Sequence, residues 1–68
     1  MNKAEAGRKI RLARVGKGLS QAALAERLKV SQATVALWES GNTFPKASNL
    51  VELAELLDIP VEELLKVG

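Results

Sequence analysis

Apolar residues recur every three or four positions along nearly the whole chain, which is the spacing of one buried face of an α-helix. The spacing is plainest in residues 46–57, where Leu50, Leu53 and Leu57 fall at i, i+3 and i+7. Strand signals are absent, because β-branched residues are scattered rather than alternating. The pattern predicts five short helices, which cover residues 3–16, 20–28, 31–40, 46–57 and 60–67.

The second and third predicted helices begin with the same grouping of residues. Ser20 and Ser31 each stand at an N-cap position, where a hydroxyl can accept a hydrogen bond from a free backbone N–H. An apolar pair brackets each serine, as in a hydrophobic staple. The two pairs are Leu19 with Leu24, and Val30 with Val35.

The link between these two helices, residues 29–31, is very short. A link of this length forces the two helix axes to cross steeply, as in a helix-turn-helix. A steep crossing needs a small residue at the contact, and Ala25 is placed to provide it. Val35 and Trp38 lie three positions apart and are expected to face the core together. The opposite face of the third helix is left with Gln32, Ala33, Ala36 and Leu37.

Length and composition limit the possible functions. The 68 residues suffice for one domain, which we expect to occupy residues 1–68. The chain has no Cys and no His, which removes disulfides, thiolate metal sites and the commonest general base. Glycine-rich phosphate loops and metal-ligand spacings are also missing, so neither an enzyme, a metal nor a cofactor is predicted. Without a signal peptide or a membrane-spanning run, we expect a cytoplasmic protein.

Charge is divided unequally along the chain. Residues 1–30 contain eight Lys and Arg and two Glu, which gives a net charge of +6. Residues 31–68 contain two Lys and six Asp and Glu, which gives a net charge of −4. A basic half indicates a polyanionic partner. Charge-rich helical proteins also show such a division by accident, so charge by itself leaves the partner open.

The stretch SQAALAERLKVSQATVALWESG resembles the helix-turn-helix of the Cro/CI-type repressors, also called the xenobiotic-response-element family. The similarity continues through GRKIRLARVGKGLSQ before it and FPKASNLVELAELLDIPVEEL after it, and so covers almost the whole chain. The resemblance implies an all-α, compact, five-helix, lambda-repressor-like domain. It also implies a sequence-specific DNA-binding transcriptional regulator, with repression as the expected activity.

The third predicted helix would be the recognition helix, whose N-terminal residues read base edges in the major groove. Gln32 can bond adenine at N6 and N7, and apolar side chains can contact the thymine methyl group. We therefore expect base contacts from Gln32, Ala33, Ala36 and Leu37. Leu37 has two alternatives, burial in the protein's own core or in a protein interface, because the family more often has a polar residue there.

The resemblance also implies phosphate contacts and one ion pair. Gln21 matches the family's glutamine that opens the second helix and touches a phosphate, and the free N–H groups of that helix start would add to it. By position, further phosphate contacts are expected from Ser31, Thr34, Ser40, Asn42, Thr43 and Lys46. Each of these residues could instead be ordinary solvated surface. Arg14 and Glu39 match the family's arginine–glutamate pair, which we interpret as structural.

Besides Leu37, four residues depart from the family pattern. Lys29 stands where a turn glycine is usual, and a left-handed conformation there would cost lysine about 1 kcal/mol relative to glycine. Ala13 stands where a larger apolar residue is usual, whereas Leu12 and Val15 are apolar on a face expected to be wet. Either the first helix is rotated, or Leu12 and Val15 meet another surface.

The expected partners are double-stranded DNA and a second copy of the chain. One helix reads only a few base pairs, so we expect a homodimer on a near-palindromic operator with half-sites about 34–36 Å apart. The dimer surface is expected at the last helix, with Leu65 and Val67, or at the loop with Phe44. The alternative is a protein-interaction module that binds a toxin or the transcription machinery. Its apolar contacts would be Leu12, Val15, Ala36 and Leu37.

Overall fold

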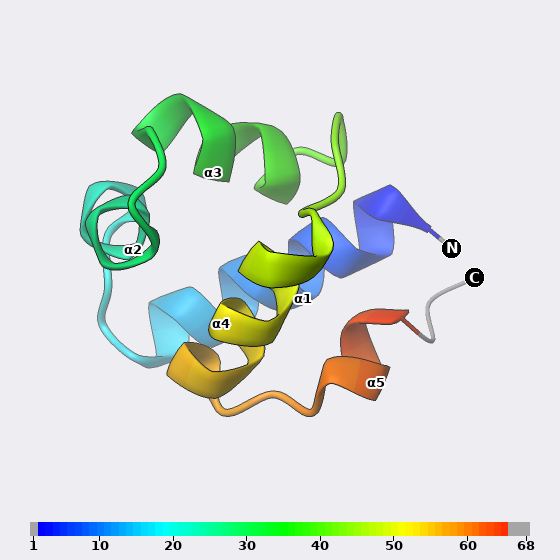
Figure 1. Ribbon diagram of the computed structural model, residues 1–68. Coiled ribbons are helices and arrows are strands. Elements are labelled where there is room, and N and C mark those ends of the chain that lie inside the picture. Colours follow the sequence, from blue (N-terminus) through cyan, green and yellow to red (C-terminus); the bar gives the residue numbers. More distant parts are fainter. Residues whose placement is uncertain (1, 66–68) are drawn as a thin grey trace.

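The computed structural model describes residues 2–65 and contains five α-helices and no strand within that range (Figure 1). The helices are α1 Lys3–Gly16, α2 Gln21–Leu28, α3 Gln32–Glu39, α4 Ala47–Leu57 and α5 Val61–Leu65. The predicted all-α, five-helix fold is confirmed. Several predicted ends differ by one residue, because the capping residues lie just outside the helices. Residues 66 and 67 of the last predicted helix lie outside the described residues.

Side-chain caps begin the first three helices. The Oγ of Ser20 accepts from the backbone N–H of Ala23 at 3.0 Å. The Oγ of Ser31 accepts from the backbone N–H of Thr34 at 3.1 Å. The side chain of Asn2 caps α1 in the same way. Both predicted serine caps are therefore present, and each removes one unsatisfied donor at a helix start.

The turn between α2 and α3 contains a left-handed residue. Lys29 has φ 58° and ψ 42°, and the next backbone N–H, that of Val30, donates to the Ala25 carbonyl at 3.0 Å. This is the usual way to end a helix, but glycine is the residue that adopts it without steric cost. Lys29 therefore adopts the left-handed conformation that was expected to be strained for a lysine. Asp58 ends α4 in the same conformation, with φ 55°.

Every helix contributes to one core. The fully buried large side chains are Ile10, Leu24, Val35, Leu53 and Leu64, one from each helix. Trp38 is 3% exposed, and Ala25, predicted to lie at the α2–α3 contact, is also 3% exposed. Burying one such large apolar side chain contributes roughly 1.5–3 kcal/mol. The shared core therefore holds α3 at a defined place relative to the other four helices.

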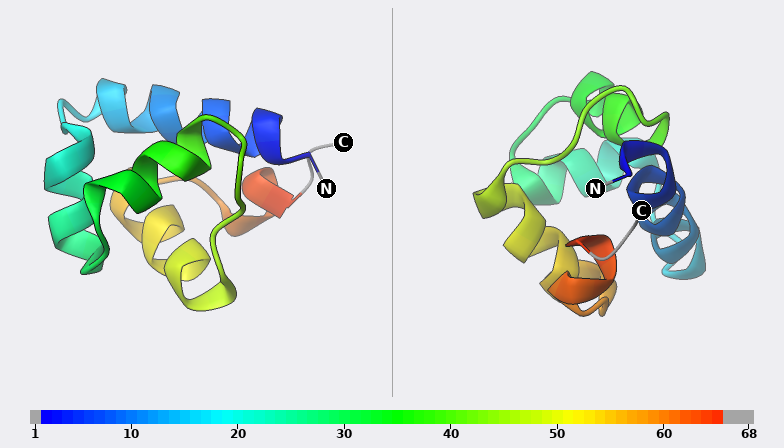
Figure 2. Two further views of the ribbon diagram at one scale, coloured as in Figure 1. Left: turned by 90° about the horizontal axis from the view of Figure 1, so that it is seen from above. Right: turned by 90° about the vertical axis from the view of Figure 1, so that its right-hand side faces the viewer.

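α3 forms one edge of the molecule. It packs against α1 and α2, while α4 and α5 lie toward the opposite edge (Figure 1). The view from above shows that none of the other described helices covers the outer face of α3 (Figure 2). None of the helices described within residues 2–65 has the length and hydrophobicity that a membrane span requires.

Candidate nucleic-acid interface

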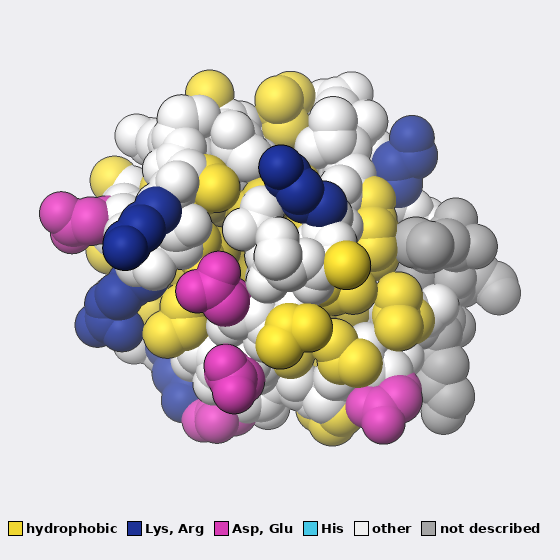
Figure 3. Space-filling model, in the orientation of Figure 1, with side chains coloured by type: hydrophobic (Ala, Val, Ile, Leu, Met, Phe, Trp, Pro, Cys, Tyr) yellow, Lys and Arg dark blue, Asp and Glu magenta, His cyan; other side chains and the backbone are white. Residues whose placement is uncertain are grey.

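The outer face of α3 carries the four residues predicted to contact bases. Gln32 and Ala33 are exposed, Ala36 is half-buried, and Leu37 is 43% exposed. Val35 lies on the opposite face and is fully buried. The structure therefore excludes burial of Leu37 in the protein's own core. Hydrophobic and uncharged side chains form the edge of the molecule over α3 (Figure 3).

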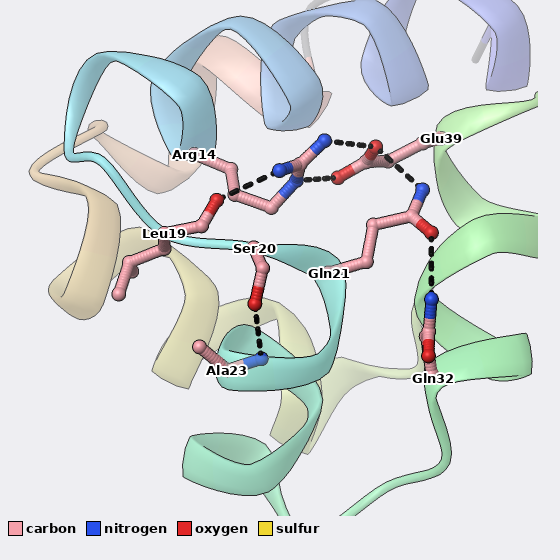
Figure 4. A network of polar contacts seen from close by, with 7 residues as sticks. All are labelled: Arg14, Leu19, Ser20, Gln21, Ala23, Gln32 and Glu39. Atoms are coloured by element: carbon pink, nitrogen blue, oxygen red, sulfur yellow. Dashed lines mark hydrogen bonds and ion pairs between the residues drawn. The ribbon is translucent and has the colours of Figure 1, made fainter.

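Arg14 of α1 and Glu39 of α3 form a two-point ion pair. Nε of Arg14 donates to Oε2 of Glu39 at 2.6 Å, and Nη2 donates to Oε1 at 3.0 Å (Figure 4). Nη1 donates to the backbone carbonyl of Leu19 at 2.7 Å. The two side chains are only 11% and 4% exposed. Hydrogen bonding to Glu39 raises the pKa of Arg14, although burial acts in the opposite direction. The pair joins α1, the α1–α2 link and the end of α3.

Gln21 connects this ion pair to the start of α3. Its Nε2 donates to Oε1 of Glu39 at 3.1 Å, and its Oε1 accepts from Nε2 of Gln32 in a long contact of 3.5 Å (Figure 4). An ionised carboxylate can only accept, so Gln21 must turn its N–H group toward Glu39. Its carbonyl oxygen is then left to face Gln32.

The amide nitrogen of Gln32 lies on the side that faces Gln21, at 3.5 Å from its carbonyl oxygen. The carbonyl oxygen of Gln32 and an N–H of the same amide are left for a ligand. Adenine presents one acceptor, N7, and one donor, the N6 amino group, in the major groove. The remaining donor and acceptor of Gln32 form the complementary pair.

The structure gives Gln21 a role that sequence reasoning missed. The sequence predicted a phosphate contact only, whereas the structure shows that Gln21 also links Glu39 to Gln32. The repeated Ser-Gln at residues 20–21 and 31–32 is the signal that could have suggested the link. It places one glutamine at the first residue of each of the two crossing helices.

The remaining residues predicted to contact phosphates lie at the two ends of α3. At its start, the Oγ atoms of Ser31 and Thr34 lie 2.9 Å apart in a hydrogen bond. After its end, Nδ2 of Asn42 donates to Oγ of Ser40 at 2.8 Å. That hydroxyl in turn donates to the Leu37 carbonyl at 3.1 Å. Of the predicted set, Gln21 and Thr34 are half-buried, and the exposed members are Ser31, Ser40, Asn42, Thr43 and Lys46.

Two apolar residues that depart from the family pattern, Leu12 and Val15, lie on the outer surface of α1. Leu12 is 65% exposed and Val15 is 56% exposed, whereas Ala13 is partly buried against the core. The first helix is thus not rotated to bury Leu12 and Val15. Of the expected dimer residues, Leu65 is 45% exposed and Phe44 packs partly against the core. Val67 lies outside the described residues.

Comparison with known proteins finds a family, a relative and solved structures that are similar to this chain. The helix-turn-helix family matches residues 10–64. The HTH-type transcriptional activator BcrR of Enterococcus faecalis is 36% identical over 61 residues, which are 90% of this chain and 30% of BcrR. The chain thus spans less than a third of the length of that relative.

Two solved structures show the same fold with DNA bound. The P22 c2 repressor in complex with a synthetic operator is 34% identical, with a TM-score of 0.85 over 90% of this chain and 92% of that chain. PlcR of Bacillus thuringiensis, in complex with the peptide PapR7 and DNA, is 33% identical. Its TM-score is 0.86 over 94% of this chain and 22% of PlcR. Because most of its length matches and the five-helix fold is shared, the chain belongs to the Cro/CI-type helix-turn-helix family.

Proposed function

We propose that this chain is a sequence-specific DNA-binding transcriptional regulator that reads the major groove with the outer face of α3. The observation that carries the proposal is the exposed amide of Gln32 at the start of an uncovered helix. Gln21 lies beside it and is hydrogen-bonded to a buried ion pair. Two structures of the same fold with DNA bound support DNA as the partner.

The proposed base contacts use both polar and apolar groups. Gln32 bonds an adenine through its free N–H and its carbonyl oxygen. Ala33 and Leu37 contact thymine methyl groups, and Ala36 packs against the bases between them. A largely uncharged face suits this task, because an apolar surface loses little when DNA covers it. The positions of these contacts along one helix predict a short recognised sequence.

The proposed phosphate contacts surround that face. The free N–H groups at the start of α2 lie beside Gln21, where they favour an anion. Beyond the end of α3, the loop adds hydroxyl and amide donors. Lys46 is exposed at the end of this loop and supplies a positive charge. The remaining proposed phosphate contacts are Ser31, Thr34, Ser40, Asn42 and Thr43.

We further propose that two copies bind a near-palindromic operator. One recognition helix covers too few base pairs for useful specificity, and two-fold symmetry would place half-sites about 34–36 Å apart. The exposed side chain of Leu65 on α5 supports a contact between copies on that side of the molecule. When such an operator overlaps a promoter, occupancy represses transcription.

A selection from random DNA duplexes at two salt concentrations tests the proposal. We expect an enriched palindromic sequence with adenine and thymine in each half-site. The logarithm of the binding constant should fall with the logarithm of salt, with a slope of about −0.9 for each phosphate neutralised. Failure to enrich any sequence, together with binding that salt does not change, would refute it.

A protein-binding module is the second candidate function. The exposure of Leu12 and Val15, three positions apart on α1, favours it, because adjoining exposed apolar side chains mark protein contacts more often than scattered ones do. In that case the main affinity would be for a protein and nearly independent of salt. The variant Leu12→Gln would weaken that protein contact and leave DNA binding unchanged.

A further inference from the structure

α1 and the end of α3 touch through their backbones at Gly7. A methyl group on Gly7 would lie 2.2 Å from the carbonyl oxygen of Trp38 and 2.8 Å from that of Glu39. Non-bonded heavy atoms pack at about 3.5–4.0 Å. Gly7 therefore permits a helix–helix separation that any other residue would increase.

A second backbone contact lies beside the first. Gly41 follows α3 with φ 83°, and a methyl group on it would lie 2.9 Å from Cα of Ala4. We call these two places, Gly7 against Trp38 and Glu39 and Gly41 against Ala4, the α1–α3 seam. Backbone atoms form both sides of the seam, so rotation of a side chain could not relieve an added methyl group.

The seam adjoins the polar contacts that lead through Gln21 to Gln32. Glu39 contributes its carbonyl to the seam and its carboxylate to both Arg14 and Gln21. Arg14 lies seven residues after Gly7 on α1, and therefore on the same helix face. α1 thus holds the end of α3 twice, once by backbone contact and once by an ion pair.

We propose that Gly7 is a positioning residue of the DNA interface. It sets the separation of α3 from α1, and through Glu39 and Gln21 it sets the place of the Gln32 amide. This inference rests on the proposed function. A methyl group at residue 7 would move the end of α3 outward by roughly 1 Å, judged from ordinary contact distances. The hydrogen bonds that Glu39 accepts would lengthen or break.

The test compares Gly7→Ala with Gly16→Ala, a matched control. Gly16 lies on the same helix, has no positive φ, and a methyl group there would meet nothing within 4 Å. Both changes are made in a Lys29→Gly background, which offsets lost stability by removing left-handed strain. The first measurement is the affinity ratio, which is the affinity for a selected duplex divided by the affinity for a scrambled one. Circular dichroism gives the folded fraction by which each affinity is corrected. The second measurement is the NMR resonance of Arg14 Nε–H.

We expect Gly7→Ala to lower the affinity ratio roughly tenfold, as for a misplaced bidentate base contact, and to shift the Arg14 resonance. Gly16→Ala should change neither quantity. A folded Gly7→Ala protein that keeps both the ratio and the resonance would show that Gly7 affects stability alone, and the proposal would be wrong.

Gly41→Ala provides a second test if Gly7→Ala does not fold. It presses on the same seam through Ala4, and it should also shift the Arg14 resonance and lower the affinity ratio. No change in either quantity would overturn the proposal. If the unaltered protein does not distinguish the two duplexes, the proposed function is wrong. The Arg14 resonance of the glycine variants then still tests whether the seam positions α3.

Discussion

Arg14 and Glu39 lie 25 residues apart in the chain and meet as a buried ion pair between α1 and α3. The guanidinium also donates to the Leu19 carbonyl, and the carboxylate also accepts from Gln21. Both charges are therefore satisfied where water has little access. The pair serves stability and, in our proposal, the orientation of the base-reading glutamine.

Removing one member of this pair should destabilise the fold strongly. Arg14→Ala leaves Glu39 buried without its partner, and we expect a loss of about 3–5 kcal/mol in the free energy of unfolding. Urea denaturation followed by the fluorescence of Trp38 measures it. Lys9→Ala is the matched control on α1, because the Lys9–Glu63 pair is 35% and 50% exposed and should contribute less than about 1 kcal/mol.

Removing both charges should be far milder than removing one. The double variant Arg14→Met with Glu39→Met leaves no buried charge, and such replacements are often neutral or stabilising. We expect it to recover most of the stability lost in Arg14→Ala. A double variant as unstable as the single one would show that packing at this site, rather than charge, is what matters.

Gln32→Ala should affect base reading and little else. The side chain is exposed, so stability should change little. Binding to the preferred duplex should weaken by about 1–3 kcal/mol, with little change on random duplexes. Fluorescence anisotropy on both duplexes provides the measurement. Gln21→Ala should weaken binding to both, because it removes a proposed phosphate contact along with the link to Gln32. An equal loss on both duplexes for Gln32→Ala would exclude it as a base reader.

Leu37→Gln should change sequence preference at one operator position. Leu37 is 43% exposed, so the substitution should leave the melting temperature nearly unchanged. A repeated selection from random duplexes would reveal the new preference. Val35→Ala, on the buried face of the same helix, should instead lower stability and keep the preferred sequence. An unchanged preference for Leu37→Gln would exclude Leu37 as a base contact.

Lys29→Gly should stabilise the protein. Lys29 has φ 58°, a conformation in which glycine avoids about 1 kcal/mol of strain. Thermal or urea unfolding measures the gain. Asp58→Gly relieves similar strain at φ 55° but also removes the Lys17–Asp58 ion pair, so its gain should be smaller. If Lys29 also contacts a phosphate, Lys29→Gly should reduce the salt slope of DNA binding by about 1.

Much of the fold follows from short-range patterns. Helical periodicity and the serine caps depend on residues within a few positions of one another. For that reason the five helices and the buried positions of Val35 and Trp38 could be predicted from the sequence alone. The Arg14–Glu39 pairing spans a longer distance, and it was expected because of the resemblance to a known family.

The tertiary structure decided which polar groups meet and which apolar groups remain exposed. Gln21 and Glu39 are 18 residues apart, and their hydrogen bond depends on how α2 crosses α3. The close approach at Gly7 likewise depends on the separation of α1 and α3. The local sequence specifies where each helix begins and ends and which of its faces is apolar, because the interactions that decide this lie within one or two helical turns. The angles and distances between helices come from packing all five around one core, and these place the Gln32 amide.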